Sequence, residues 1–315
     1  MGDAEMTIDT DEQERSAPTS VPSHRAPDYG TPLRRSSSDP TLGDGRKAPT
    51  SFGWAPTPTL TDRRVLDSPA FVVVDDVTSR EAAGACVAEG LERLGRPVQR
   101  IPADGTPPRG ERATGPLNHP LLVHVGSASV LREPTAQGVA RIVDAYRPGA
   151  TITYEIGLHD EPTGSPEELR AGVEAMVAKA DVVIATTRDL ELLYPGEARE
   201  TVLRRWVGAG PGLVVVSAGS EGAWAANAVG TTATVRGRGA DDEGESFVAG
   251  LIDGLWKAGL LGVTNRPDLR TLVWGTLQEL VDNATVAAAI AGRTDGVAPS
   301  REELEAARGI PRLGR

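Results

Sequence analysis

The chain has 315 residues, enough for one large domain or two small ones with a full hydrophobic core. Its formal net charge of -11 argues against a general role in binding nucleic acid, because neutralising phosphates requires clustered Lys and Arg. A single cysteine excludes an internal disulfide, and the four histidines show no close paired spacing, so we expect no structural metal.

Residues 1–67 are crowded with Ser, Thr, Pro, Gly, Asp and Arg, and they contain hardly an aliphatic run. Such a segment buries too little apolar surface to offset the entropy of ordering it. We therefore predict a disordered N-terminal tail over 1–67 and one folded domain over 68–315. The sequence also lacks a run of about 18 apolar residues and a basic-then-apolar signal layout, which predicts a cytoplasmic protein without a membrane partner.

From Pro69 onward, short β-branched runs alternate with Ala- and Leu-rich stretches. This alternation is typical of βαβ units and of a parallel sheet covered by helices. We predict a helix that opens at the N-cap Ser165, with Glu167 and Glu168 in its first turn, where negative charge suits the helix dipole. In the first half of the domain we predict strands at 71–74, 121–125, 151–154 and 181–186, and helices at 79–94, 135–146, 165–180 and 189–194.

The second half continues the pattern and ends in helices. We predict a helix at 199–208, a strand at 213–217, a hairpin partner at 222–226, and helices at 246–259, 268–292 and 300–308. No internal repeat or heptad pattern occurs in the sequence. The predicted fold class is α/β, with a doubly wound, mostly parallel sheet flanked by helices.

The segment from Arg238 to Gly254, RGADDEGESFVAGLIDG, joins an acidic stretch to the start of a predicted helix. Taken alone, it is as well explained by an N-cap and an acidic first turn of a buried helix. However, it resembles the DTxGAGDxFxxG signature of the PfkB (ribokinase) family of sugar kinases. The second half of that signature is present as Gly244, Ser246, Phe247, Ala249 and Gly250, while its Gly-Ala-Gly-Asp core reads DEGE at 242–245.

Four more segments match landmarks of this family, in the family's order. They are LLVHVGSASVLREP at 121–134, ADVVIATTRDLELLYPG at 180–196, GPGLVVVSAGSEGAWA at 210–225 and AIAGRTDGVAPSREEL at 289–304. The chain therefore resembles the fructokinase-like branch over about 69–308. The resemblance implies a ribokinase-like fold, ATP and Mg as possible cofactors, and a sugar or nucleoside as the possible substrate.

The resemblance places Glu245 at the position of the catalytic Asp, which accepts the proton of the sugar hydroxyl. The extra methylene of Glu moves the carboxylate by about 1 Å. A displacement of this size lowers the reaction rate on the order of a hundredfold. Gly244 remains from the anion hole that backbone N–H groups form at a helix N-terminus. Asp242 and Glu243 would repel a polyphosphate there.

The resemblance also assigns candidates to the nucleotide side. Ser217, Gly219 and Gly222 match the TxGxxG turn that contacts phosphates, although a glycine pair after a strand is also an ordinary turn. Thr186 and Asp189 match the Asn-x-x-Glu motif, which implies an indirect role for Asp189 in holding the metal through water. A capping pair in front of a short helix explains Thr186 and Asp189 equally well.

On the sugar side, the family's GGxxxN motif aligns with Glu81, Ala82 and Cys86. Cys86 is therefore a weak candidate for substrate contact, and otherwise we expect it to be a small core residue. Asp75, or its neighbour Asp76, at the end of the first strand is the other substrate candidate, in place of the family's sugar-binding Asp. At 155–159 the family's Asp-Pro-Asn-x-Arg reads EIGLH, which lacks the Asn and the Arg.

Between Ile101 and Leu121 the chain has only a short link, where the family inserts the strands of its lid. We therefore expect the lid to be largely missing, and with it the exclusion of water from the site.

Three hypotheses remain open. The first is a pseudokinase that serves as a binding or regulatory module, and the second is a divergent active kinase with Glu245 as base. The third makes the N-terminal tail the working part and the folded domain its carrier. RRSSSDP at 34–40 would then be a site where phosphorylation alters the local charge, and Trp54 an anchor for a protein partner.

Overall fold

The structure is a computed structural model that describes residues 71–75, 83–103, 120–126, 131, 133, 135–158, 165–238 and 244–308. All of these residues belong to one compact unit of the chain. The tail predicted over 1–67 lies outside the described residues, as do Asp76, Glu81, Ala82, His159, Asp242 and Glu243.

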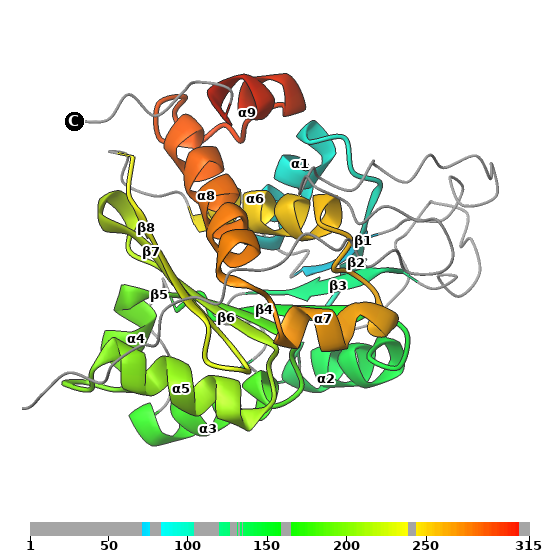
Figure 1. The fold of residues 1–315 in the computed structure, drawn as a ribbon. Coiled ribbons are helices and arrows are strands. Elements are labelled where there is room, and N and C mark those ends of the chain that lie inside the picture. Colours follow the sequence, from blue (N-terminus) through cyan, green and yellow to red (C-terminus); the bar gives the residue numbers. More distant parts are fainter. Residues whose placement is uncertain are drawn as a thin grey trace, which may run out of the picture. The chain divides into compact units, whose positions relative to one another are not determined.

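The described strands form one eight-stranded sheet in the order β2-β1-β3-β4-β5-β6-β7-β8 (Figure 1). The first six are parallel, and β7 and β8 extend the sheet as an antiparallel hairpin. Their bounds are β1 Phe71–Asp75, β2 Val98–Pro102, β3 Leu122–Val125, β4 Thr151–Glu155, β5 Val182–Thr186, β6 Leu213–Ser217, β7 Gly222–Asn227 and β8 Thr232–Arg236. The predicted mostly parallel α/β sheet is confirmed.

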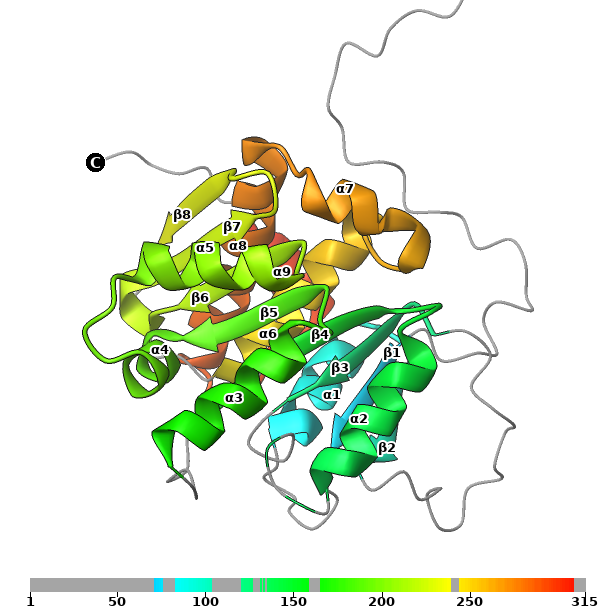
Figure 2. The same ribbon diagram turned by 90° about the horizontal axis from the view of Figure 1, so that it is seen from below.

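Helices cover both faces of the sheet, and each face has its own hydrophobic core. One face packs against α1 (Ala83–Arg93), α6 (Gly244–Lys257), α8 (Trp274–Ala291) and α9 (Arg301–Arg308). The other face packs against α2 (Thr135–Tyr146), α3 (Pro166–Val177), α4 (Thr187–Leu193) and α5 (Arg199–Ala209), and Figure 2 shows α2, α3 and α5 in front of the strands. The central strands are buried on both faces, which explains why they read as continuous apolar runs.

The chain order places a topological switch point between β1 and β3. β1 pairs with β2 on one side and β3 on the other. α1, which follows β1, lies on one face of the sheet, whereas α2, which follows β3, lies on the opposite face. Ligands of doubly wound sheets bind outside the carboxyl ends of the strands at such a point.

Three predictions about elements differ from the structure. The strands β2 and β8 were not predicted, and both are edge strands of the sheet. The single helix predicted over 268–292 is wrong, because α7 (Arg266–Arg270) and α8 are separated at Leu272 and Val273. The amide of Asn227 donates to the Leu272 carbonyl (2.7 Å), and Val273 is extended, so a contact from the hairpin holds the interruption.

The helix α6 crosses the middle of the sheet and is held to its neighbours by buried polar contacts. Asp253 of α6 is fully buried and pairs with Arg96, which follows α1, and with Lys257 (2.8 Å). The amide of Asn283 in α8 donates to the carbonyl of Gly250 (2.6 Å). A Cβ at Gly250 would lie 2.6 Å from the Cβ of Ala287, so this glycine allows α6 and α8 to approach closely. Within the described part of the chain, no helix is long and apolar enough to cross a membrane.

Candidate functional site

The carboxyl ends of the parallel strands gather most of the predicted site residues. Asp75, Glu155, Thr186 and Ser217 are the last residues of β1, β4, β5 and β6. Thr186 and Ser217 are direct partners in the register of β5 and β6. Because parallel strands end at one edge, residues up to 142 positions apart in sequence, which is 217 minus 75, share that edge of the sheet.

The N-terminus of α6 meets this edge at Gly244. A Cβ at Gly244 would lie 3.7 Å from Oε1 of Glu155, and Glu245 follows in the first turn of the helix as a half-buried residue. Glu155 itself is only 4% exposed. The positive end of the α6 dipole, which is a ready anion site, therefore has a carboxylate of the protein itself beside it.

His124 lies next to this carboxylate, on the same face of the sheet. It is fully buried in β3, and its Nε2 is 3.7 Å from Oε2 of Glu155. Neither of these two atoms has a hydrogen-bond partner in the part of the chain that the structure describes. The other ring nitrogen, Nδ1, is 3.0 Å from the hydroxyl of Thr153. We did not predict a role for His124, although a histidine inside an apolar strand is a visible signal.

Thr186 and Asp189 form a complete capping box at the start of α4. The Thr186 hydroxyl accepts from the Asp189 N–H (3.1 Å), and Oδ2 of Asp189 accepts from the N–H (2.7 Å) and the hydroxyl (2.8 Å) of Thr186. Oδ1 of Asp189 accepts from the N–H of Leu158 (2.8 Å). Both oxygens of this buried side chain are thus used inside the protein, so the capping pair is confirmed, and the role of Asp189 toward a metal stays a prediction.

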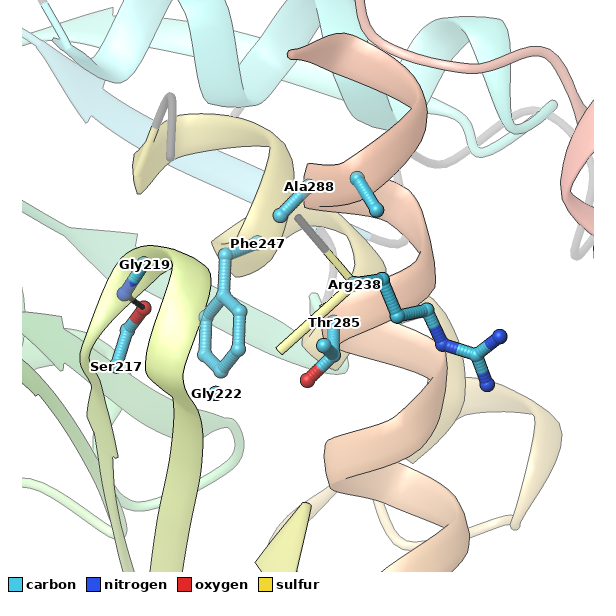
Figure 3. Close-up of a pocket in the computed structure, with 8 residues that line it drawn as sticks. Ser217, Gly219, Gly222, Arg238, Phe247, Thr285 and Ala288 are labelled. Carbon is cyan, nitrogen blue, oxygen red and sulfur yellow. Dashed lines mark hydrogen bonds between the residues drawn. The ribbon is translucent and has the colours of Figure 1, made fainter. Parts of the chain in front are cut away.

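Ser217, Gly219 and Gly222 line one small cavity (Figure 3). The Gly219 N–H donates to the Ser217 hydroxyl (3.4 Å). Gly222 has φ +116°, and a Cβ there would collide with the backbone of β8, so the hairpin itself requires this glycine. The opposite wall is formed by Arg238, Phe247, Thr285 and two alanines of α8.

The cavity measures about 10 Å³, which is close to the volume needed for one water. In Figure 3 the Phe247 ring stands between the Ser217 turn and Thr285, and the Arg238 guanidinium points away from that turn. Arg238 pairs with Asp282 of α8 (2.9 Å). Arg238 and Thr285 were not predicted as site residues, because the segment that follows β8 and the helix α8 meet this turn only in the fold.

Comparison with known proteins shows what this architecture resembles. No family profile matches the chain. The ATP-dependent 6-phosphofructokinase of Thermoanaerobacterium thermosaccharolyticum is 24% identical over 149 residues, and the match spans 45% of each chain, less than half of that relative.

Solved structures match over most of their length. The fructokinase of Vibrio cholerae O395 in its fructose, ADP and calcium ion bound form has a TM-score of 0.58 at 19% identity, covering 75% of this chain and 97% of that one. The fructokinase of Xylella fastidiosa gives 0.59 at 14%, covering 76% and 98%, and the aminoimidazole riboside kinase of Salmonella enterica gives 0.55 at 14%, covering 76% and 99%. The chain has the ribokinase-like fold of the PfkB-family kinases. The fold implied by the sequence resemblance is confirmed.

In a ribokinase-like fold with a lid, further strands would be expected away from the main sheet. All eight strands of the described residues belong to the one sheet, so none of them forms a separate lid. Residues 104–119, where the family inserts its lid strands, lie outside the described ranges.

Of the two residues predicted to contact the substrate, Asp75 and Cys86, only Asp75 lies at the sheet edge that carries the other site residues. Asp75 ends β1 at the same sheet edge as Glu155. Cys86 is exposed in the first turn of α1. The expectation that Cys86 is a core residue is therefore wrong, because this turn presents it to solvent while Val87 and Ala88 fill the core.

The cofactors of ribokinase-like kinases can be tested against these residues. The 10 Å³ cavity at Ser217 and Gly219 is smaller than the scale of about 300 Å³ or more that is typical of a small-molecule site. Among the described residues, no group of three or more His, Cys, Asp or Glu side chains is placed to hold a metal ion. ATP and Mg therefore stay predictions for this chain.

Proposed function

We propose that this protein is a catalytically impaired ribokinase-like protein, a pseudokinase of the PfkB type that acts in the cytoplasm as a binding or regulatory module. The observation that carries the proposal is the carboxylate of Glu155, which is one methylene longer than the Asp of the family motif and is buried at 4% exposure beside the first residue of α6. Kinase chemistry requires this helix end to stabilise negative charge on the transferred phosphoryl group. A carboxylate within about 4 Å of such a group disfavours it by about 1 kcal/mol in water and about 4 near a protein surface.

Two further observations support impairment. The cavity at Ser217 and Gly219 holds about one water, and both oxygens of Asp189 are bonded inside the protein. Glu245 is longer than the Asp of the family signature, so its carboxylate is displaced from the position of the family's base. Together these features disfavour phosphoryl transfer at the base, the anion hole and the nucleotide side.

The decisive experiment is an activity screen of the purified full-length protein with Mg-ATP and a panel of sugars and nucleosides. We expect no turnover on any of them. A rate near about 1 per second, the low end for kinases, would overturn the proposal. A thermal-shift titration with ATP, ADP and AMP in the presence of Mg supplements it, because a ligand that binds the native state must raise its apparent stability.

A variant that removes the charge of Glu155 tests whether this carboxylate weakens anion binding at the start of α6. We expect Glu155→Gln to strengthen the binding of inorganic phosphate at least tenfold by calorimetry, since it removes one like charge from the helix end. Asp144→Asn, which makes the same change of charge on exposed α2, is the matched control and should leave phosphate binding unchanged. Equal phosphate binding by wild type and Glu155→Gln would show that Glu155 does not block the anion site.

A divergent, active ATP-dependent kinase is the second candidate. It is favoured by one observation: Thr186, Ser217 and Gly244 all lie at the same sheet edge or at the helix end that meets it. In that case Glu245 would be the base, Asp189 would act toward Mg through water, and Ser217 with Gly219 would contact phosphates. Turnover that is abolished by Glu245→Gln would establish this candidate.

The tail is a separate proposal. In this proposal, residues 1–67 contain a segment that binds a partner protein. Deleting residues 1–67 and comparing the proteins that co-purify with the full chain and with the truncated chain tests the proposal. Retention of every partner by the truncated chain would refute it.

A further inference from the structure

The hairpin β7–β8 has one open face. Ala223, Ala225, Ala233 and Val235 point to the core under α8, while Trp224 and Ala226 lie on the opposite face with the core of α5. On that opposite face Thr232 and Thr234 are exposed. The hairpin and α5 therefore enclose a groove, which we call the α5–hairpin groove and which is lined by Arg199, Leu203, Arg204, Trp224, Thr234 and Arg270, among others.

The groove has the size of a small-molecule site. Its volume is about 570 Å³, inside the range of about 300–1,000 Å³ that is typical of ligand pockets. Its floor is a sheet surface with the small side chains of Ala226, Thr232 and Thr234, so it is flat. Its wall is the apolar side of α5, with Leu203 and Val207. This shape fits a flat, partly apolar body.

The charge of the groove is opposite to that of the protein. The chain carries a net charge of -11, yet the groove is lined by three arginines and by only one acidic residue, Glu200. Glu200 is already paired with Arg199 (2.9 Å). Within the described residues, neither Arg204 nor Arg270 lies within 4 Å of a carboxylate. Two guanidinium groups are therefore available to an anion from outside.

These two cations lie at different points along the groove. Nη1 of Arg270 donates to the carbonyl of Gly210, just past the end of α5 (2.8 Å), so Arg270 marks that end. Arg204 lies in the middle of α5, six residues before Gly210, which is about 9 Å along the helix axis at 1.5 Å per residue. Both guanidinium groups keep N–H donors beyond the single hydrogen bond that each makes.

The other end is aromatic. The guanidinium carbon of Arg199 lies 3.4 Å from the centroid of the half-buried Trp224 ring. Arg199 is the first residue of α5, where a cation is disfavoured by the helix dipole, so the stacking on Trp224 and the pair with Glu200 hold it there. Its Nε is buried and has no hydrogen-bond partner among the described residues.

We propose that the α5–hairpin groove binds a small organic anion with a flat, apolar body. Its carboxylate, sulfonate or phosphate lies at Arg204, and its body lies on the hairpin beside Trp224, with Arg270 adding positive charge at the end of the groove near Gly210. The site is on the face of the sheet that α5 covers, whereas the α6 end of the candidate site lies on the opposite face. The groove therefore serves the protein independently of whether phosphoryl transfer occurs.

A pair of fluorescent probes tests both the charge and the shape of the ligand. Anilinonaphthalene sulfonate is a flat apolar anion, and N-phenylnaphthylamine is its uncharged counterpart. We titrate each into the full-length protein at a fixed ionic strength. We expect saturable binding of the sulfonate at one site, at least tenfold tighter than the neutral probe.

Three variants locate the binding. Arg204→Glu should weaken binding of the sulfonate at least tenfold, and Glu200→Gln should tighten it at least twofold, because both side chains are exposed groove residues of α5. Arg141→Glu, the same charge reversal on the exposed part of α2, is the control and should change binding less than twofold. Binding that is unchanged by Arg204→Glu, weakened by Glu200→Gln, or as tight for the neutral probe would overturn the proposal, as would a lack of saturable binding.

Discussion

The ion pair between Arg96 and Asp253 gives the sharpest test of how α6 is held in place. Only 8% of the Arg96 side chain and 1% of the Asp253 side chain are exposed. Arg96 also lies over the ring of Trp256, 5.2 Å from its centroid, and Lys257 pairs with the other oxygen of Asp253. Asp253→Ala would leave a buried guanidinium without its partner, which typically costs about 3–5 kcal/mol.

That loss is large beside the usual stability of a domain, about 5–15 kcal/mol. Asp253→Asn keeps an acceptor for Arg96 but loses the charge, so we expect an intermediate loss of about 1.5–3 kcal/mol. The double variant Arg96→Met with Asp253→Leu removes both charges of the buried pair. It should be closer to wild type than Asp253→Ala, because the charge that loses its partner is then only that of Lys257, whose side chain is 19% exposed.

Equilibrium unfolding in urea, followed by tryptophan fluorescence, measures these differences. The control is the surface ion pair of Lys179 and Asp144, whose Nζ and Oδ1 atoms are 2.8 Å apart and whose side chains are 37% and 61% exposed. Asp144→Ala should cost at most about 1 kcal/mol. If Asp253→Ala costs no more than Asp144→Ala, the reasoning from burial is refuted.

Three more predictions concern packing, capping and pH. Gly250→Ala should destabilise the fold by about 1–3 kcal/mol, since the added Cβ would overpack against Ala287; unchanged unfolding in urea would contradict this. Thr186→Ala should cost about 1 kcal/mol through loss of the cap, and a neutral result would remove the capping explanation. Burial, with a hydrogen bond to Glu174, raises the pKa of Tyr194 to about 12 from about 10. The stabilisation from its neutral phenol is complete below pH about 10 and is lost as the pH rises through about 12. The free energy of unfolding of Tyr194→Phe should therefore fall less steeply with pH in that window than the free energy of unfolding of wild type. Equal slopes for the two proteins would contradict this prediction.

The central strands were predictable from sequence, because burial on both faces imposes an apolar run on each. LVVVS of β6 and FVVVD of β1 are such runs. The edge strands β2 and β8 have no such signal. VQRIP of β2 is mostly half-buried, and TATVR of β8 buries only every second residue, so neighbouring strands and not local sequence define them. The break between α7 and α8 was hidden for the same reason, since Asn227 lies 45 residues before the carbonyl that it holds.

Site residues could be predicted from the sequence where a polar residue directly ends an apolar strand. They could not be predicted where two strands pair and bring residues together. Thr186 and Ser217 could be placed at one edge because each ends an apolar run. His124 and Glu155 are 31 residues apart in the sequence. They are neighbours only because β3 and β4 pair in parallel. From the sequence, Glu155 is only a longer residue at the position of the Asp in the family's Asp-Pro-Asn-x-Arg segment. The fold adds that its carboxylate reaches the start of α6.

Several positions of the kinase motifs that this chain keeps can be explained by packing alone. Phe247 is 2% exposed in the core beneath α6, and Gly250 is required by the close approach of α8. Gly222 in the turn is required by the hairpin. By contrast, Gly244 and Glu245 border the anion site and have no comparable steric constraint, since a Cβ at Gly244 would make only an ordinary 3.7 Å contact. These packing positions therefore argue for the fold, and activity has to be argued from the altered ones, where both carboxylates at the end of α6, those of Glu155 and Glu245, are one methylene longer than the Asp residues of the family motifs.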